Sequence, residues 1–313
     1  MKRTAAVLTE PGRFDIQEDE ITCPDNGVVL RVAACGLCMS DIPAFRGETN
    51  RFFPLRLGHQ GAGTVVETGR NVSRFKEGDR VTGIFGEAFS DHATALENNL
   101  VTVPENIALE YAPGDMLKSC ISAARMATPL PGDTVMVSGC GAMGLTVLSA
   151  LLCPSLTVIA VDKDENKLEK ARKLGCENTF LRSERKLKDK VIALSRGRGV
   201  DVCIEVTGES RPFRFDTSTL VHGSGKLVLL CIKGMENRYD VGAMMNGTIL
   251  YATHPDYFPG QIENLDKAMA LLGKGIFPMQ DIVTHRYGLT DIQQAFDDLI
   301  NRPSGYIKGI VKI

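Results

Sequence analysis

Apolar residues follow two different periodicities along the chain, and the change falls near Met116. Before it, short β-branched runs separated by Gly, Asn and Asp are typical of strands joined by turns, as at Val28–Ala34, Gly63–Val66 and Arg80–Phe85. No long stretch there has helical periodicity, and Ser40–Phe45 could form one helical turn. The first part of the chain is therefore predicted to be β-rich.

From Thr134 onward, apolar runs alternate with segments of helical spacing. The runs predict strands at Thr134–Ser138, Thr157–Val161, Val200–Val206, Lys226–Cys231 and Ile307–Lys312. Helical spacing is found at Asp164–Leu174, Lys186–Ser195, Ile262–Leu272 and Asp291–Ile300. Strands that alternate with helices indicate an α/β fold with a doubly wound parallel sheet.

Composition and charge exclude several classes of protein. The 313 residues are 43% hydrophobic and 24% charged, with a net charge of −2, which is typical of soluble globular proteins. This balance offers no basic surface for nucleic acid, and no apolar run is long enough to span a membrane. Met1–Thr4 lead into a predicted strand without the apolar stretch of a signal peptide, so we expect a cytoplasmic protein.

Nine irregularly spaced cysteines do not suggest a disulfide framework, because the number is odd and no export signal precedes them. Most lie in apolar runs, where a free cysteine packs as a small hydrophobic residue. Cys35 and Cys38 form a Cys-x-x-Cys pair that could be redox-active. No second pair exists in the sequence, so a zinc ribbon cannot close.

The segment Val135–Gly144, VMVSGCGAMG, has the glycine pattern of a dinucleotide-binding turn. Gly139, Gly141 and Gly144 match G-x-G-x-x-G after a predicted strand and at the start of a helix. A pyrophosphate would bind at the N-terminus of that helix, near Ala142, where free N–H groups favour anions. The alternative is a turn whose glycines serve packing only.

Asp162 ends the next predicted strand of this βαβ unit. An acidic residue there can accept both hydroxyls of the adenosine ribose and would repel a 2′-phosphate. Lys163 follows, and no arginine stands beside it. We therefore expect NAD rather than NADP, with a merely solvated Asp as the alternative.

Two further motifs give the chain a specific resemblance. Cys35–Asp41 reads CGLCMSD and Gly58–Gly63 reads GHQGAG; with Phe75–Val81 and the glycine turn they resemble zinc-type medium-chain alcohol and polyol dehydrogenases over nearly the whole chain. In that family, a cysteine and a histidine at these positions bind the catalytic zinc. The resemblance makes Cys38 and His59 the expected ligands.

The resemblance also implies a third ligand shortly before the nucleotide domain, usually Cys or Glu, and a gapless local match gives Asp115. Three protein ligands with one open position are typical of catalytic zinc. A helix cap is the alternative role for Asp115. Relatives often hold a second, structural zinc with four closely spaced cysteines, which this sequence lacks, so we expect one ion per subunit.

Two positions depart from the family pattern. Gln60 stands where relatives usually have Glu beside the ligand histidine, and a neutral amide is a weaker ligand, so we expect Cys38, His59, Asp115 and water around the ion. Ser40 takes the first place of the family's proton relay, but Pro43 and Arg46 occupy the places where its histidine would be sought. His92 and His254 are possible relay residues in principle, although a lone histidine more often has a structural role.

The polar side chains of Arg46, Glu87 and Lys118 could reach the hydroxyls of a polyol or lie at the surface.

The fold implied by the resemblance has two domains. A GroES-like catalytic domain comprises residues 1–116 and is completed by 261–313, and a Rossmann NAD-binding domain comprises 117–260. Met143 and Ser119 match family positions near the nicotinamide ring, with simple packing as the alternative. The region around Gly247–Ala252 matches a strand through which family members pair, so we expect a homodimer or homotetramer.

The implied activity is zinc-dependent hydride transfer between NAD and a small secondary alcohol, polyol or sugar-type substrate. One alternative is a zinc-free reductase of the same fold that reduces an enone or quinone with NADPH. Another is a non-catalytic binding protein. The zinc-ligand motifs and Asp162 argue against both.

Overall fold

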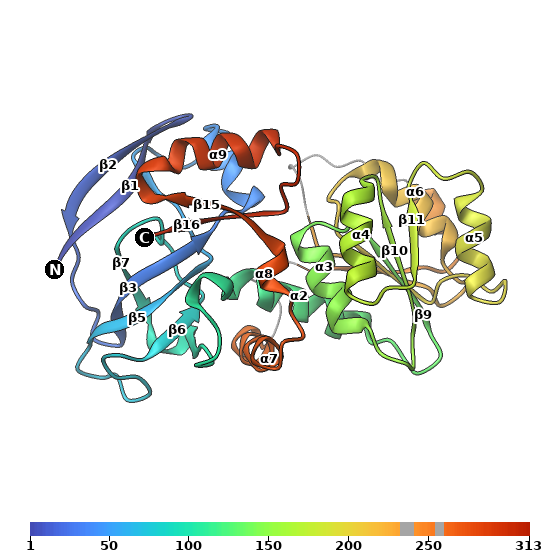
Figure 1. Cartoon of the computed structure of the whole chain (residues 1–313), viewed down its shortest axis with the longest axis horizontal. Helices are drawn as coiled ribbons and strands as arrows, with labels where there is room; N and C mark the ends of the chain where they lie inside the picture. Colours follow the sequence, from blue (N-terminus) through green and yellow to red (C-terminus); the bar gives the residue numbers. More distant parts are fainter. Residues whose placement is uncertain (232–240, 254–259) are drawn as a thin grey trace. The chain divides into compact units, whose positions relative to one another are not determined.

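The computed structural model describes residues 1–231, 241–253 and 260–313, which fold into two compact units (Figure 1). The first unit comprises Met1–Lys118 and Ile262–Ile313, and the second comprises Ser119–Gln261. His254, named above as a possible relay residue, lies outside the described residues.

The first unit is built on two sheets. A three-stranded sheet has the order β2-β1-β4, and a larger one has the order β15-β16-β3-β5-β6-β8, with β7 also paired to β3. The strands are β1 (Lys2–Glu10), β2 (Arg13–Glu20), β3 (Gly27–Gly36), β4 (Leu55–Arg56), β5 (Gly61–Thr68), β6 (Arg80–Gly83), β7 (His92–Leu96), β8 (Leu100–Thr102), β15 (Val283–Gly288) and β16 (Lys308–Lys312). The predicted β-rich character of this part of the chain is confirmed.

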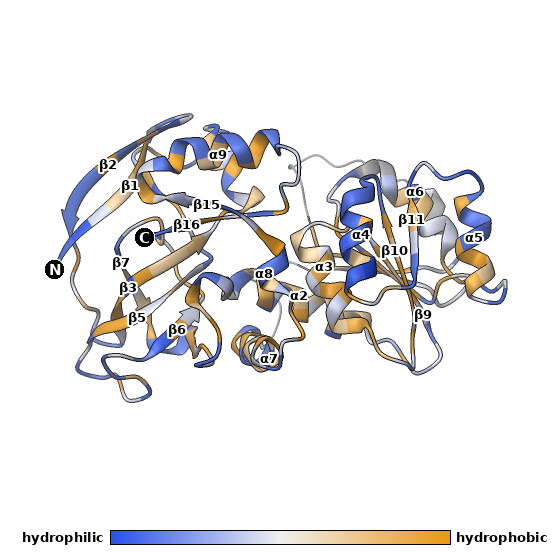
Figure 2. Cartoon of the chain, in the orientation of Figure 1, coloured by the Kyte–Doolittle hydropathy of each residue, from blue (hydrophilic) through white to orange (hydrophobic). Residues whose placement is uncertain are grey.

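The helices of this unit are α1 (Ile42–Phe45), α2 (Gly114–Ala127), which continues into the second unit, α7 (Gln261–Gly273), α8 (Met279–Ile282) and α9 (Ile292–Asn301). Of these, α1 and α8 are single turns, and the longer ones lie at the end of the first segment or in the second segment of the chain. In Figure 2, hydrophobic and hydrophilic residues alternate along α9, as expected for a helix with one buried face. That face carries Phe296, whose ring lies 5.0 Å from Phe45 and 5.8 Å from Phe89 between centroids. The C-terminal segment thus completes the core of the N-terminal one.

The second unit is a six-stranded parallel sheet with the order β11-β10-β9-β12-β13-β14. Its strands are β9 (Thr134–Ser138), β10 (Thr157–Asp162), β11 (Asn178–Leu181), β12 (Val202–Glu205), β13 (Lys226–Leu229) and β14 (Ile249–Ala252). Its own helices are α3 (Ala142–Leu151), α4 (Glu165–Lys173), α5 (Leu187–Leu194) and α6 (Ser210–Thr219). The predicted parallel α/β sheet is confirmed.

The central strand β9 explains why this sheet forms. All five of its residues are buried, as expected when helices cover both faces of a parallel sheet. The chain proceeds from β9 through β10 to β11 on one side and through β12 to β14 on the other. The strand order therefore reverses beside β9, and at such a switch point the carboxyl ends of the strands leave a crevice for ligands.

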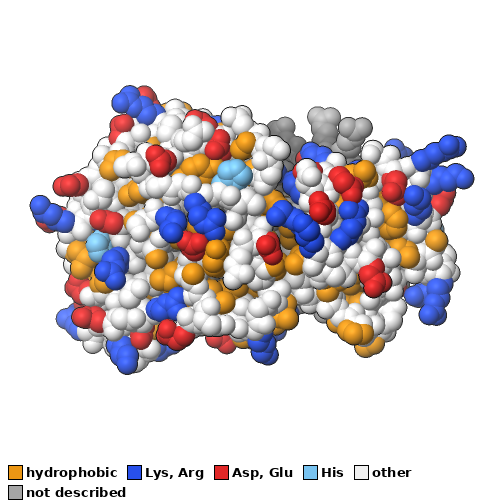
Figure 3. Space-filling model, viewed as in Figure 1, with side chains coloured by type: hydrophobic (Ala, Val, Ile, Leu, Met, Phe, Trp, Pro, Cys, Tyr) orange, Lys and Arg blue, Asp and Glu red, His pale blue; other side chains and the backbone are white. Residues whose placement is uncertain are grey.

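Charges at the surface are mixed. On the face shown in Figure 3, acidic and basic side chains are interspersed, in keeping with a net charge of −2. Within the described ranges, no helix is long and apolar enough to cross a membrane.

Candidate metal and cofactor sites

The Cys35–Asp41 segment begins at the end of β3 and is held by backbone hydrogen bonds to two other parts of the chain. Gly36 N donates to Gln60 O at 3.1 Å, and Leu37 N donates to Gly309 O at 3.0 Å. A side chain at Gly36 would come within 2.7 Å of Gln60 Oε1 and 3.1 Å of Lys308 Nζ. Glycine at this position therefore allows the close packing that holds the segment carrying Cys38.

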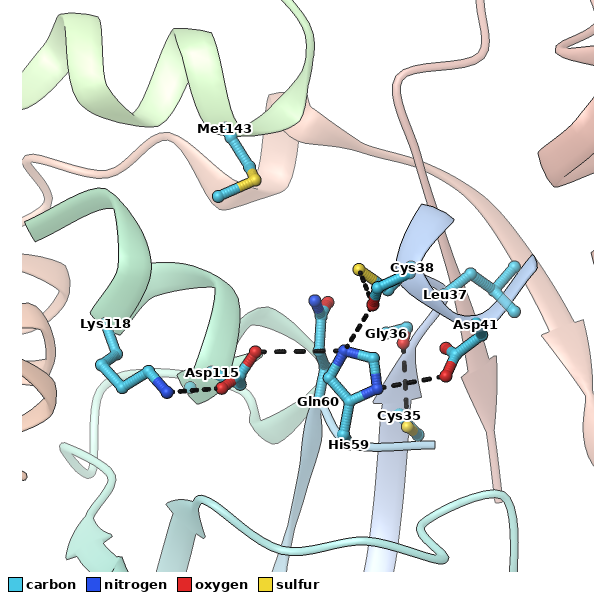
Figure 4. Close-up of polar contacts among 12 residues, drawn as sticks. Cys35, Gly36, Leu37, Cys38, Asp41, His59, Gln60, Asp115, Lys118 and Met143 are labelled. Atoms are coloured by element: carbon cyan, nitrogen blue, oxygen red, sulfur yellow. Dashed lines mark hydrogen bonds and ion pairs between the residues drawn. The ribbon is translucent and has the colours of Figure 1, made fainter. Parts of the chain in front are cut away.

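The side chains of Cys38, His59 and Asp115, which carry donor atoms for a metal, lie together at this loop (Figure 4). Ser40 Oγ lies 3.1 Å from Cys38 Sγ and 3.3 Å from His59 Nε2. Asp115 Oδ2 lies 3.9 Å from the same His59 nitrogen. The fold thus gathers a thiol, an imidazole and a carboxylate from three separate segments of the chain.

This arrangement is not a finished coordination shell. Across the part of the chain that the structure describes, no three His, Cys, Asp or Glu side chains are grouped so that they could hold an ion as they stand. The Ser40 hydroxyl lies between Cys38 and His59, and one oxygen of Asp115 accepts a hydrogen bond from Lys118. The donor types nevertheless match catalytic zinc, which binds S, N and O ligands and keeps one position open.

His59 is oriented by a buried carboxylate. Its Nδ1 lies 3.2 Å from Asp41 Oδ1, which leaves Nε2 directed toward Cys38 and Asp115. A carboxylate on the far nitrogen is the usual partner of a metal-binding histidine, because it fixes both the tautomer and the ring orientation. This contact was not predicted, and the position of Asp41 within the CGLCMSD motif is the signal that could have indicated it.

The charges of Cys38 and His59 stabilise each other. Burial opposes the charged imidazolium, but hydrogen bonds to Asp41 and Cys38 outweigh it and raise the pKa of His59 to about 11. Burial alone would raise the pKa of the Cys38 thiol, but the hydrogen bond and charge of His59 and the charge of Lys308 lower it. Thiolate is the form of cysteine that binds metals.

Gln60 is held by a lysine from the far end of the chain. Lys308 is buried, and its ammonium donates to Gln60 Oε1 and, at 2.7 Å, to Leu37 O. The oxygen is the only atom of an amide that readily binds a metal, and here it accepts from Lys308. This contact supports the expectation that Gln60 stays outside the ion's shell. Lys308 lies far from the other motifs in sequence and was not predicted.

Polar residues considered for substrate binding have other partners. Glu87 Oε2 accepts from Arg3 Nη1 at 2.6 Å, and the fully buried Lys118 contacts Asp115. Arg46 lies 3.9 Å from Glu48 and remains half exposed. Lys118 is therefore part of the candidate metal site rather than a surface residue.

The three fingerprint glycines have different surroundings in the second unit. Gly139 has a φ of +108°, which favours glycine, and it forms the tight turn after β9. A side chain at Gly144 would overlap the carbonyl oxygen of Gly139, whereas one at Gly141 would meet no atom within 4 Å. The turn, the open approach for a ligand and the close packing at the helix start are the three roles expected of such glycines.

The remaining residues predicted to bind the cofactor lie in the same unit. Asp162 is buried at the end of β10 and accepts from the backbone N–H groups of Cys140 and Asp164. Lys163 is exposed, with its ammonium 3.4 Å from Glu209. Partly buried Met143 follows Ala142 at the start of α3, and its sulfur accepts from Cys231 at 3.6 Å. Ser119 is buried on α2.

Comparison with known proteins identifies the class. Residues 24–132 match the alcohol dehydrogenase GroES-like domain, and residues 139–264 match the zinc-binding dehydrogenase model. The chain is 26% identical over 361 residues to an alcohol dehydrogenase of Cupriavidus necator, with 98% of each protein covered. It is 25% identical over 342 residues to an L-threonine 3-dehydrogenase of Marinomonas sp., again with 98% of each covered. The crystal structure of benzyl alcohol dehydrogenase from Acinetobacter calcoaceticus has the same fold, with a TM-score of 0.88, 22% identity, and 100% and 99% of the two chains covered.

A GroES-like domain combined with a Rossmann-type parallel sheet defines a two-domain dehydrogenase fold, as the sequence predicted. The chain belongs to the zinc-type medium-chain alcohol dehydrogenase family. As a member of this family it is an oxidoreductase of alcohol substrates.

Proposed function

We propose that the protein is a zinc-dependent, NAD-linked dehydrogenase of a secondary alcohol, polyol or sugar-type substrate, with one zinc ion per subunit. The observation that carries this proposal is the grouping of Cys38, His59 and Asp115, with Asp41 behind the histidine. Catalysis is assigned to residues 1–116 with 261–313, and NAD binding to 117–260. The family match supports zinc and a nicotinamide cofactor in general terms, and the residues above support the finer assignment.

In this mechanism Cys38, His59 and Asp115 would hold the ion. Bound zinc supplies a Lewis acid that lowers the pKa of the substrate hydroxyl. Asp41 keeps the His59 ring fixed through Nδ1, so that Nε2 is the nitrogen available for binding. The pair of negative groups, Cys38 and Asp115, offsets the charge of a divalent cation.

Ser40 is placed to receive the proton that the alcohol loses. Its hydroxyl lies beside both Cys38 and His59, and the residue is exposed. A hydroxyl can accept one proton and donate another, so Ser40 can pass the proton on to solvent or to the cofactor ribose. Hydride would leave the carbon that bears this hydroxyl for the nicotinamide, so that the proton and the hydride together account for the two-electron oxidation.

Asp162 is the basis for proposing NAD. One carboxylate oxygen accepts from Cys140 N in the fingerprint turn and the other from Asp164 N after β10, which fixes the group beside Gly139–Gly144. A fixed negative charge there can bind ribose hydroxyls and repels a 2′-phosphate. Gly139, Gly141, Ala142 and Gly144 would hold the pyrophosphate, Met143 and Ser119 would lie near the nicotinamide ring, and Lys163 would lie beside the ribose. The second unit would then be the NAD-binding one.

We propose assembly into a homodimer or homotetramer through β14. This strand is at the edge of the sheet, and Ile249 and Leu250 are each 42% exposed. An exposed apolar edge strand is normally covered by a partner. Light scattering should give a dimer or tetramer for the wild type and a smaller species for Leu250→Arg; a wild-type monomer would refute this assembly.

The decisive experiment measures metal content by mass spectrometry on protein purified without chelator, for the wild type and Asp115→Ala. About one zinc per subunit in the wild type, and clearly less in the variant, supports the ligand set. Full zinc retention in the variant moves the third ligand elsewhere. A wild type without metal that turns over an enone with NADPH rejects the proposal in favour of the zinc-free reductase.

Cofactor and substrate need a second assay. A panel of secondary alcohols and polyols is tested with NAD and with NADP, for the wild type and Asp162→Ala. The wild type should prefer NAD in kcat/KM, and the variant should lose that preference. A wild-type preference for NADP would reject the role given to Asp162.

A further inference from the structure

Lys118 is a fully buried lysine that contacts a candidate metal ligand. It lies one helical turn after Asp115 on α2, and its ammonium is 2.7 Å from Asp115 Oδ1. Residues three apart on a helix lie on the same face, so the helix itself brings the two groups together. Figure 4 shows the lysine on the side of Asp115 that faces away from His59.

A buried ammonium is costly unless a countercharge is close to it. Asp115 supplies that countercharge with Oδ1, while its Oδ2 lies 3.9 Å from His59 Nε2. The two oxygens of one carboxylate therefore have different environments, one beside a lysine and the other beside the donor atoms of Cys38 and His59.

We propose that Lys118 is a positioning residue of the zinc site, which restricts Asp115 to a single ligating oxygen and weakens the hold on the ion through its charge. This inference rests on the proposed zinc-dependent function. With Oδ1 bound by the ammonium, Asp115 would offer only Oδ2 to the ion, which would leave a coordination position for substrate. The Lys118 charge offsets part of the negative charge of Asp115, so the site is less negative than Cys38 and Asp115 alone would make it, which favours a negatively charged substrate oxygen.

Two substitutions separate the hydrogen bond from the charge. Lys118→Gln keeps a donor for Asp115 Oδ1 but has no charge, whereas Lys118→Met removes both and keeps a similar length. Lys267→Met is the matched control, because Lys267 also pairs with a helical carboxylate, Glu263, at 2.6 Å, but it is exposed and lies on α7.

The assay uses the whole chain and Co²⁺, which reports coordination through its visible absorption. Affinities are measured by competition with a chelator, and circular dichroism checks that each variant is folded. Four-coordinate Co²⁺ absorbs much more strongly than five-coordinate Co²⁺. We expect both Lys118 variants to bind Co²⁺ and Zn²⁺ roughly tenfold or more tightly than the wild type, because a nearby positive charge is removed. Only Lys118→Met should lose absorption, because it no longer holds Asp115 Oδ1 away from the ion.

The outcomes distinguish this inference from the function on which it rests. If the wild type and the variants bind either ion with equal affinity and equal spectra, Lys118 has only a structural role and the inference is wrong. If Lys118→Met binds the ion more weakly, the lysine only orients Asp115 and its charge does not weaken binding, which also contradicts the inference. If the folded wild type binds neither ion, the zinc-dependent function fails as well.

Discussion

Glu205 should make the folded second unit less stable as the pH rises. It is the last residue of β12 and is 1% exposed. Burial raises its pKa from 4.5 to about 7; the hydrogen bonds from Thr207 and Gly208 oppose this shift, and the charge of Asp216 adds to it. The carboxyl accepts from Thr207 N at 2.7 Å and Gly208 N at 3.2 Å, so it is held in place in either protonation state.

The sign follows from which state binds the proton. Between pH 4.5 and about 7 the folded chain keeps a proton on Glu205 that the unfolded chain has released. The free energy of unfolding therefore falls as the pH rises through this window and levels off above it. A pKa shift of this size corresponds to about 3 kcal/mol in total, of which about 2.5 kcal/mol falls between pH 5 and pH 8.

Glu205→Gln removes the titration and serves as the reference. Urea unfolding of both proteins at pH 5 and pH 8 is followed by hydrogen exchange in β9 and β12, because these strands report the second unit specifically. The stability of the wild type relative to the variant should fall by about 2.5 kcal/mol from pH 5 to pH 8. Glu169→Gln, at an exposed helical site, is the control and should show no such change. A difference between wild type and Glu205→Gln that stays the same at both pH values would refute the reasoning.

Three further predictions test packing, the cofactor turn and the metal site. Phe296→Ala should lower the free energy of unfolding by about 3–5 kcal/mol, because a fully buried ring is removed, whereas Phe52→Ala, at 93% exposure, should leave the denaturation midpoint unchanged. Gly144→Ala should destabilise the second unit, since its side chain would overlap a backbone oxygen; Gly141→Ala should cost less than about 1 kcal/mol in stability yet weaken NAD binding measured by calorimetry. Equal effects of the two glycine variants on stability would contradict this division of roles. Asp41→Ala should weaken zinc binding roughly 10–100-fold in a chelator competition while the protein stays folded, and unchanged affinity would show that Asp41 does not orient His59.

Much of the fold could be predicted from short stretches of sequence. The strand predicted at Thr134–Ser138 matches β9 residue for residue, because a β-branched run bounded by turn residues is a local signal. The ends of the strands were less well predicted. The strand predicted at Arg80–Phe85 ends at Gly83, and the one predicted at Val200–Val206 extends only from Val202 to Glu205. Hydrogen bonding to neighbouring strands decides these limits, and those neighbours are distant in sequence.

By itself the sequence determined which residues could do chemistry. The fingerprint glycines and the CGLCMSD and GHQGAG motifs each lie within one short segment, so their spacing is enough to suggest a cofactor turn and ligands such as Cys38 and His59. These assignments remain predictions. The sequence also indicated where strands alternate with helices, because periodicity is a local property.

Only the tertiary structure decided which groups surround those residues. Lys308 reaches Gln60 because β16 pairs with β3, and the carboxylate of Asp41 meets His59 because two loops pack together. The burial of Lys118 beside Asp115 likewise depends on what covers α2, although the two residues are one turn apart. Periodicity and motif spacing describe neighbours along the chain, whereas charge, burial and hydrogen bonding depend on segments that the fold brings together from far apart in sequence.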